Sequence, residues 1–252
     1  MGSVLRKMRY LAAPGMVPKV SALERITPRL LLRAYRMADA GDWLEIEHDE
    51  AVRQGLGWPT RTSAAAYAHL RARTHHTVLS RPGDLLVLAA EHAGHVIGDV
   101  SLHLRTVAPA TRTVEIGWLL RSAYSGRGLA TEAADAMLDV AFEHAHAVLV
   151  TAVVKGWNEA SSKLALRLGF RPVAQRGELT TYVLSRQDRQ RALGAVLREH
   201  SGAIADPDGR SREVSGLPAV PSYARRVRGW CATTPAELRS HQSAEGTRSP
   251  RH

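Results

Sequence analysis

The sequence predicts a mixed α/β fold, of the α+β kind, in which a mostly antiparallel central sheet is flanked by helices. Apolar strand-like segments come first and follow one another through short turns, which is typical of antiparallel pairing. A strand, helix, strand, helix order comes next and adds helices to the faces of the sheet. The 252 residues, 44% of them apolar, are enough for one packed core.

The first half of the chain supplies strands in hairpin order and two helices. Continuous or alternating apolar residues indicate the strands, and apolar residues at helical spacing indicate the helices. Glu91-His92-Ala93-Gly94 is a good hairpin connection between two of the strands. We expect a strand at 29–33, helices at 38–46 and 63–73, and strands at 85–90, 96–104 and 113–120.

The second half begins with a glycine-rich turn at residues 125–128 and continues in longer elements. Apolar residues such as Ala133 and Met137 recur at helical spacing after this turn, and a β-branched run further on predicts a buried strand. Gly169 favours the end of a helix. We expect a helix at 129–144, a strand at 148–154, a helix at 158–168 and a last strand at 178–184.

Sustained periodicity is confined to the middle of the chain, which divides it into three parts. Residues 1–25 are expected to be a flexible N-terminal leader. Residues 26–186 hold the elements above and form the folded domain. Residues 187–252 are rich in Arg, Ser and Pro, and apart from a short helix at 191–198 we expect a mostly disordered tail.

Composition excludes several classes of protein. Cys231 is the only cysteine, so the chain has no intramolecular disulfide and no cysteine-based zinc site, and a cytoplasmic location fits best. No run of about 18 apolar residues is present to cross a membrane. The net charge of +10 comes from 30 Arg and 4 Lys against 24 acidic residues. Such a charge favours a partner that carries phosphate.

The turn at 125–128 lies between a strand and a helix, an arrangement that binds phosphate. Backbone N–H groups at the helix start point outward, and the helix dipole favours negative charge there. Gly126 and Gly128 let a phosphate approach closely, and Arg127 adds positive charge. The turn lacks the Lys-Ser/Thr pair of a nucleotide-hydrolysing loop and the third glycine of a dinucleotide site. A glycine turn that only starts a helix is the alternative.

Three segments form a set. The first is Ser125-Gly126-Arg127-Gly128-Leu129-Ala130, followed by Thr131-Glu132-Ala133. The second is Asn158-Glu159-Ala160-Ser161-Ser162-Lys163, ending in Leu168-Gly169-Phe170, and the third is the opening at 26–33 with Asp39 after it. Together they resemble the GNAT superfamily of acyl-CoA-dependent N-acetyltransferases, whose pyrophosphate motif is Gln/Arg-x-x-Gly-x-Gly/Ala. The opening is similar to the ribosomal-protein N-terminal acetyltransferase (Rim-type) branch.

The resemblance implies the GNAT acyl-CoA N-acyltransferase fold, with acetyl-CoA as co-substrate between two splayed strands and no metal. The chain departs from the family at two positions. Ser125 replaces the usual Gln or Arg, and Ala165 stands where many relatives have a tyrosine general acid, so another group or water protonates the leaving thiolate. The cofactor-binding residues that the resemblance implies are Trp118, Leu119, Leu120, Ser125, Gly126, Arg127, Gly128, Leu129, Ala130, Thr131 and Asn158. For the Trp118 side chain, a core position is the alternative.

Acetyl transfer from a thioester to an amine requires a base for the ammonium proton and a proton for the departing sulfur. The resemblance makes Glu115 the candidate base, because acidic residues at the corresponding position serve so in several relatives. A solvated strand residue is the alternative. Ser161 is the candidate acid, since the resemblance places its helix beside the sulfur. Helix capping, together with Asn158, is the alternative.

Other polar clusters are assigned to the surface. Consecutive residues at 47–50, Glu-His-Asp-Glu, cannot all converge on one ion in regular structure, so we expect a solvated loop there. His75-His76 and the pair His144 and His146 are expected at the surface as well. Trp58-Pro59 falls where relatives form the acceptor pocket and is a candidate specificity element.

These observations predict an acetyl-CoA-dependent N-acetyltransferase that moves an acetyl group to a primary amine by direct attack. Similarity to the branch points to a protein N-terminus as acceptor, and a small-molecule amine such as an aminoglycoside, a polyamine or an amino acid is the alternative. A catalytically weak acyl-CoA-binding or RNA-associated module, with nucleic acid on the basic tail, is the alternative from another class. We expect a monomer or homodimer without membrane association.

Overall fold

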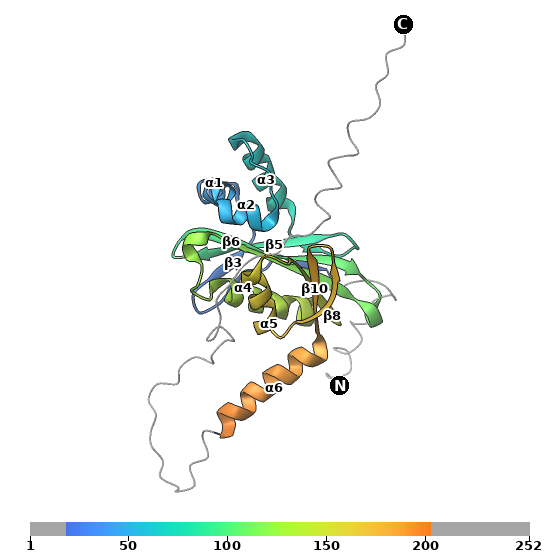
Figure 1. Ribbon diagram of the computed structural model, residues 1–252. Helices are drawn as coiled ribbons and strands as arrows, with labels where there is room; N and C mark the ends of the chain where they lie inside the picture. The colour runs from blue at the N-terminus through green and yellow to red at the C-terminus, as the bar shows by residue number, and fades with distance from the viewer. Residues whose placement is uncertain (1–18, 203–252) are drawn as a thin grey trace, which may run out of the picture.

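The computed structural model describes residues 19–202, shown as coloured ribbons in Figure 1. Its strands are β1 (Val20–Ser21), β2 (Arg25–Ile26), β3 (Leu31–Arg33), β4 (Val78–Leu79), β5 (Leu85–His92), β6 (His95–Thr106), β7 (Thr113–Leu120), β8 (Leu149–Lys155), β9 (Arg171–Arg176) and β10 (Leu179–Ser185). Its longer helices are α1 (Ala40–His48), α2 (Glu50–Leu56), α3 (Ser63–His75), α4 (Leu129–Asp139), α5 (Glu159–Arg167) and α6 (Arg186–Gly202). Short helical turns lie at Met37–Asp39, Pro109–Thr111, Ser122–Tyr124 and Val140–His144.

Eight strands form one central sheet in the order β2-β3-β5-β6-β7-β8-β10-β9. Neighbouring strands are antiparallel except β7 and β8, which are parallel. Strands β1 and β4 pair in a separate two-stranded sheet. The mixed, mostly antiparallel sheet that the sequence predicts is therefore confirmed.

Helices cover both faces of this sheet. Figure 1 shows α1, α2 and α3 on one face and α4 and α5 on the other, while α6 extends away from the body. Because both faces are covered, residues 85–90 of β5 and 114–120 of β7 are all buried, and they are apolar apart from Glu115. Strand β7 therefore lies in the core, which fixes the backbone leading into the glycine-rich turn.

Helix α2 was not expected from the sequence. Its buried apolar side chains, Val52 and Leu56, are too few to give a helical period. Its two ends nevertheless carry capping signals. The Asp49 carboxylate accepts the N–H of Val52 at 3.2 Å, and Gly57 ends the helix with φ of 68°.

The solvated loop expected over residues 47–50 is wrong. Glu47 belongs to α1 and is 2% exposed, and its carboxylate contacts Arg61 Nη1 at 2.9 Å and His69 Nδ1 at 2.6 Å. Asp49 caps α2, whereas His48 and Glu50 are exposed. The four polar residues separate because successive helical positions point in different directions, so that one carboxylate reaches the interior and finds buried partners there.

Three other boundaries differ from expectation. Strand β9 was missed because all six of its residues are exposed at the edge of the sheet, so its sequence shows no alternation. The helix expected over 129–144 is α-helical to Asp139 and continues as a π-helical turn, Val140–His144. Helix α6 spans Arg186–Gly202, where a helix was expected only at 191–198.

The segments expected to flank the domain contain regular structure at their inner ends. The leader expected at 1–25 includes β1, which pairs with β4. The tail expected from 187 begins within α6, where Arg189 is 5% exposed and contacts Asp135 at 2.6 Å and Asp139 at 2.9 Å on α4. Residues 1–18 and 203–252, including Cys231, lie outside the described residues.

Candidate active site

Strands β7 and β8 separate from each other part way along. Their parallel pairing covers three residue pairs and ends at Glu115 and Thr151. Beyond this point β7 stays on β6 as far as Leu120, and β8 stays on β10 as far as Lys155. The sheet therefore opens into a wedge that widens from Glu115 towards the glycine-rich turn. Backbone N–H and C=O groups of residues 117–120 that point away from β6 border this wedge.

A glycine on the neighbouring strand β6 allows the end of β7 to approach it closely. Gly98 of β6 pairs with Leu120, and a Cβ atom at this glycine would lie 2.2 Å from the Leu119 carbonyl oxygen. No other residue permits so close an approach of the two backbones. Strand β7 is therefore held on β6 over the stretch where it leaves β8.

The glycine-rich turn follows β7 and begins α4. Gly126 and Gly128 have φ of 75° and 77°, in the left-handed region that favours glycine, and Gly128 is the N-cap residue of the helix. Ser125, Gly126 and Arg127 are exposed, while Leu129 and Ala130 are buried at the start of α4. The first-turn N–H groups of α4 have no acceptor inside the helix, so this turn offers an anion site.

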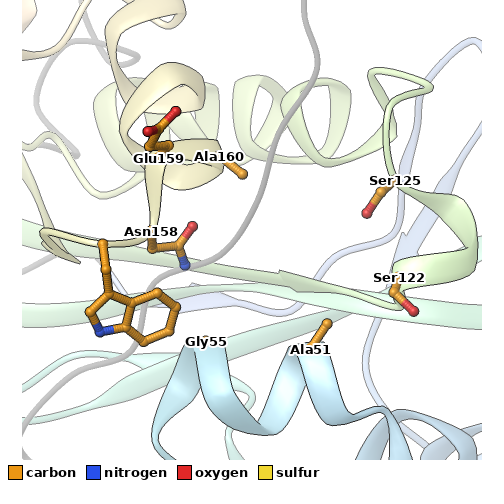
Figure 2. A pocket seen from close by; sticks show the side chains of 8 residues that line it. Ala51, Gly55, Ser122, Ser125, Asn158, Glu159 and Ala160 are labelled. Carbon is orange, nitrogen blue, oxygen red and sulfur yellow. The ribbon is translucent and has the colours of Figure 1, made fainter.

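A pocket of about 410 Å³ opens at the wide end of the wedge. Figure 2 shows its walls: the start of α5 on one side, the loop after β7 on the other, and α2 below. The residues that line it are Ala51, Gly55, Ser122, Ser125, Trp157, Asn158, Glu159 and Ala160. Two of them, Ser125 and Asn158, are predicted site residues, so the structure brings the two predicted motifs to one cavity. The contribution of α2 was missed together with the helix.

The Asn158 side chain caps a helix and lines the pocket. Its Oδ1 accepts the N–H of Ser161 at 3.0 Å and caps α5. Its side chain reaches into the pocket in Figure 2, and its Nδ2 lies 3.7 Å from where a Cβ atom of Gly55 would be. Ser161 is fully buried, and so is Ala165, which occupies the position of the family's tyrosine. At Asn158 the structure therefore shows helix capping, the alternative role given in the sequence analysis.

The face of the sheet on which Glu115 lies follows from the register. Asp99 and His103 are four residues apart on β6 and so share a face, and His103 pairs directly with Glu115. Asp99 contacts Arg73 of α3 at 2.8 Å, which identifies the face covered by α1, α2 and α3. Glu115 therefore points to this face, at the narrow end of the wedge.

Glu115 is buried beside one cation. Its side chain is 9% exposed, and Oε2 contacts Arg105 Nη2 at 2.8 Å and Nε at 3.0 Å. Within the described part of the chain, Oε1 is buried without a hydrogen-bond partner. Burial raises the pKa of Glu115 above its ordinary 4.5, and Arg105 opposes that rise. The solvated-strand alternative is excluded by this burial.

Several predicted cofactor residues have inward side chains. Trp118, Leu119 and Leu120 are each at most 4% exposed, so only their backbone groups face the wedge. The Trp118 side chain is thus part of the core, as its alternative states. Thr131 is 0% exposed, and its hydroxyl has no hydrogen-bond partner among residues 19–202.

Trp58, the candidate specificity element, belongs to an aromatic cluster between α1, α2 and α3. Its ring lies 5.0 Å from that of His69 and 6.0 Å from that of Trp43, and the Arg61 guanidinium stacks on it at 4.9 Å. Burial would raise the pKa of Glu47 beneath this cluster, but His69 and Arg61 reverse the effect and hold it below its ordinary value. The charged groups near Trp58 are therefore already paired with one another.

Two features are absent from residues 19–202. No group of three His, Cys, Asp or Glu side chains in this range is arranged to hold a metal ion. None of the helices described is long and apolar enough to cross a bilayer.

The fold recurs in solved structures. A GCN5-related N-acetyltransferase from Brucella melitensis is 18% identical with a TM-score of 0.57, over 77% of this chain and 92% of its own. RimL, a ribosomal L7/L12 alpha-N-protein acetyltransferase, is 15% identical with a TM-score of 0.51, over 65% and 94%. MccE, a microcin C7 self immunity acetyltransferase in complex with acetyl-CoA and AMP, is 16% identical with a TM-score of 0.51, over 63% and 93%. Identities this low show a shared fold alone.

The family is shown by a separate match. A family model described as an acetyltransferase (GNAT) domain matches residues 29–171, which is more than half of the chain. This range contains α2, the loop after β7 and the start of α5, whose residues line the pocket, together with the glycine-rich turn and α4. The match also confirms the predicted enzyme class. The chain belongs to the GNAT family of acetyl-CoA-dependent N-acetyltransferases.

Proposed function

We propose that acetyl-CoA binds in the wedge between β7 and β8 and donates its acetyl group to an α-amine. The observation that carries this proposal is the separation of the two strands at Glu115, which leads from a buried carboxylate to the pocket and the glycine-rich turn. In this arrangement the pyrophosphate binds the N–H groups of residues 125–131 and the side chain of Arg127. The pantetheine arm bonds to the backbone of residues 118–120 and to Asn158.

Glu115 acts as the base in this proposal. The acceptor arrives as an ammonium ion from the face covered by α1, α2 and α3, and Glu115 takes its proton directly or through one water. The amine nitrogen then attacks the thioester carbonyl, the C–S bond breaks as the amide C–N bond forms, the nitrogen gives its second proton to water, and CoA leaves as a thiolate. A raised pKa makes Glu115 a stronger base, while Arg105 favours the ionised form that accepts the proton.

The thiolate needs only a weak acid. A thiol with a pKa of about 8.5 leaves readily as an anion, so water in the open pocket can return the proton. Ser161, the candidate acid from the sequence, is fully buried behind Asn158. We therefore propose water as the proton donor and retain Ser161 as the alternative to be tested.

The surface beside Glu115 supports a peptide-sized acceptor. Residues of β8 and β10 that share its face, including Thr151, Val153, Thr181 and Val183, are half-buried, whereas those on the opposite face are buried apart from Thr180. A partly open strip of sheet therefore continues from the base. RimL is a ribosomal L7/L12 alpha-N-protein acetyltransferase, and the opening at 26–33 resembles that branch, so we propose a protein N-terminus as acceptor.

The test is thiol release from acetyl-CoA with a panel of N-terminal peptides, polyamines and aminoglycosides. We expect turnover with the peptides. Glu115→Gln should lower kcat/KM by about 10²- to 10⁴-fold, the usual contribution of a general base, with acetyl-CoA binding retained in calorimetry. Glu178→Gln, which changes an exposed glutamate in the turn before β10, is the matched control and should behave as the wild type.

Three results would contradict this scheme in different places. Turnover with polyamines or aminoglycosides alone would show that the acceptor is a small-molecule amine and not a protein N-terminus. A Glu115→Gln variant as fast as the wild type would show that Glu115 is not the base. Absence of acetyl-CoA binding by the wild-type protein would show that residues 125–131 are not a cofactor site.

A further inference from the structure

The first turn of α4 contains a carboxylate where a phosphate-binding helix start should carry no net negative charge. Glu132 lies four residues after Gly128, and its backbone N–H bonds to the Gly128 carbonyl at 3.1 Å. Its side chain is 2% exposed. An unpaired carboxylate so close to a bound diphosphate would repel it, so the neutralisation of Glu132 matters for the site.

The segment between β2 and β3 provides that neutralisation. Arg29 Nη2 contacts Glu132 Oε2 at 2.6 Å, and Arg29 Nε donates to the same oxygen at 2.7 Å. Oε1 accepts the backbone N–H of Arg29 at 2.8 Å and the hydroxyl of Thr27 at 2.6 Å. Both oxygens of the carboxylate are therefore saturated by donors from one short segment, in which Arg29 precedes Glu132 by 103 residues in the sequence.

The third nitrogen of the same guanidinium holds the turn itself. Arg29 Nη1 donates to the carbonyl oxygen of Arg127 at 2.8 Å. Because the peptide between Arg127 and Gly128 is trans, its N–H points opposite to its C=O. Fixing the Arg127 carbonyl on Arg29 therefore directs the Gly128 N–H to the other side of the peptide, away from Arg29.

A chain of contacts through two aromatic rings connects the backbone of Arg29 to the side chain of Arg127. The Arg29 carbonyl oxygen lies 2.9 Å from His92 Nδ1, and the His92 ring lies edge-on to Tyr124 at 6.2 Å. The Arg127 guanidinium stacks on Tyr124 at 5.7 Å. The carbonyl and the side chain of Arg127 are thus both positioned through contacts that include Arg29.

We propose that Arg29 is a positioning residue for the diphosphate of acetyl-CoA, because its guanidinium neutralises Glu132 and orients the peptide before Gly128. This inference rests on the proposed cofactor site at residues 125–131. A planar guanidinium with several donors can serve the carboxylate and the carbonyl together, whereas a lysine ammonium is a point charge without that fork. Arg29→Lys therefore keeps the ion pair with Glu132 and loses the bond that orients the turn.

The experiment measures the dissociation constants of two donors by calorimetry. Acetyl-CoA carries the diphosphate, and acetyl-pantetheine, titrated at millimolar concentration, lacks it. We expect the wild type to prefer acetyl-CoA, and Arg29→Lys to weaken acetyl-CoA about tenfold, as expected for losing one charged hydrogen bond, with acetyl-pantetheine and the melting temperature unchanged. Arg36→Lys is the matched control, since Arg36 makes one exposed ion pair, with Glu24 at 3.3 Å.

Each other result has a definite meaning. If Arg29→Lys keeps the wild-type preference for acetyl-CoA, the positioning role is wrong while the cofactor site stands. If both donors weaken equally and the melting temperature falls, Arg29 supports the fold and not the turn, and the inference is overturned. If the wild type does not distinguish the two donors, the diphosphate is not bound at residues 125–131, and the proposed cofactor site fails first.

Discussion

Burial and an ion pair shift the pKa of Glu115 in opposite directions. Burial raises the pKa of the carboxyl group, Arg105 lowers it, and the net position is above the ordinary 4.5. A carboxyl group whose pKa is raised by folding favours its protonated form in the folded protein. The unfolding free energy therefore falls as pH rises through that pKa, so the ionisation of Glu115 costs stability.

Arg105 should control the pH at which the enzyme becomes active. Arg105→Ala removes the charge and the hydrogen bond that lower the pKa of Glu115, so that pKa rises further and the base is protonated over a wider range. The acidic limb of the kcat/KM profile should move to higher pH. Arg105→Lys retains the charge and should leave the limb near that of the wild type. A limb in the same place for Arg105→Ala would show that the titrating group is not Glu115.

Substitution of Ser161 tests whether this serine has a structural role or acts as the proton donor. Because its side chain is 0% exposed, Ser161→Ala should lower the unfolding free energy by about 1 kcal/mol and leave kcat within about twofold of the wild type. Asn158→Ala should also lower the unfolding free energy, and in addition it should raise KM for acetyl-CoA, since Asn158 lines the pocket. A hundredfold fall in kcat for Ser161→Ala at an unchanged melting temperature would restore the serine as proton donor. Thermal unfolding and steady-state kinetics of both variants decide the matter.

At the scale of elements, one carboxylate joins α2 to the loop after β7. Asp49 accepts the N–H of Val52 at the start of α2 and, through Oδ2, the N–H of Ser122 at 2.6 Å. Both α2 and this loop line the pocket. A second contact, from Arg121 to Glu45 at 2.5 Å, connects the same loop to α1. The width of the pocket therefore depends on contacts made outside it.

Asp49→Ala should affect cofactor binding beyond the loss of a helix cap. We expect the unfolding free energy to fall by about 1 kcal/mol and KM for acetyl-CoA to rise several-fold. Thr62→Ala is the control, because Thr62 caps α3 through the N–H of Ala65 at 3.3 Å and does not line the pocket. Kinetics and chemical denaturation of the two variants provide the comparison. Equal KM values for the two would mean that α2 does not set the geometry of the cofactor site.

At the scale of the whole molecule, regular structure continues past residue 186, where the sequence predicts the end of the domain. Arg189 of α6 is held between Asp135 and Asp139 of α4. Burial raises the pKa of Asp135, and Arg189 opposes that rise. Helix α6 therefore adds a buried cation to the helix that begins at the glycine-rich turn.

Arg189→Ala should lower the unfolding free energy by about 3 kcal/mol, because it leaves Asp135 buried without its cation. Arg191→Ala is the control: its side chain is 68% exposed and lies 3.7 Å from Asp188. That change should alter stability by less than about 1 kcal/mol. Urea denaturation measures both. If the two variants have equal unfolding free energies, α6 lies outside the cooperative unit and the domain ends at residue 186.

The parts of this molecule that could be predicted are those whose signal is local. Apolar runs identified β5 to β8, and the glycines at 126 and 128 identified the start of α4. Pairs of residues distant in the sequence were not predictable: Arg29 with Glu132, and Glu47 with Arg61, look like solvated charges until the fold brings them together. At the candidate site, the family resemblance pointed to Asn158, but the contribution of α2 required the helix itself to be known.

The short pairing of β7 with β8 divides the sheet along a seam. Five strands lie on one side of it and three on the other, and three residue pairs at one end join their backbones. An extended ligand in the wedge would bond to both edges and act as the missing length of strand. The acyl donor would then be a structural part of the sheet while it is bound. Binding of acetyl-CoA would join the two parts of the sheet, and release of CoA would separate them again.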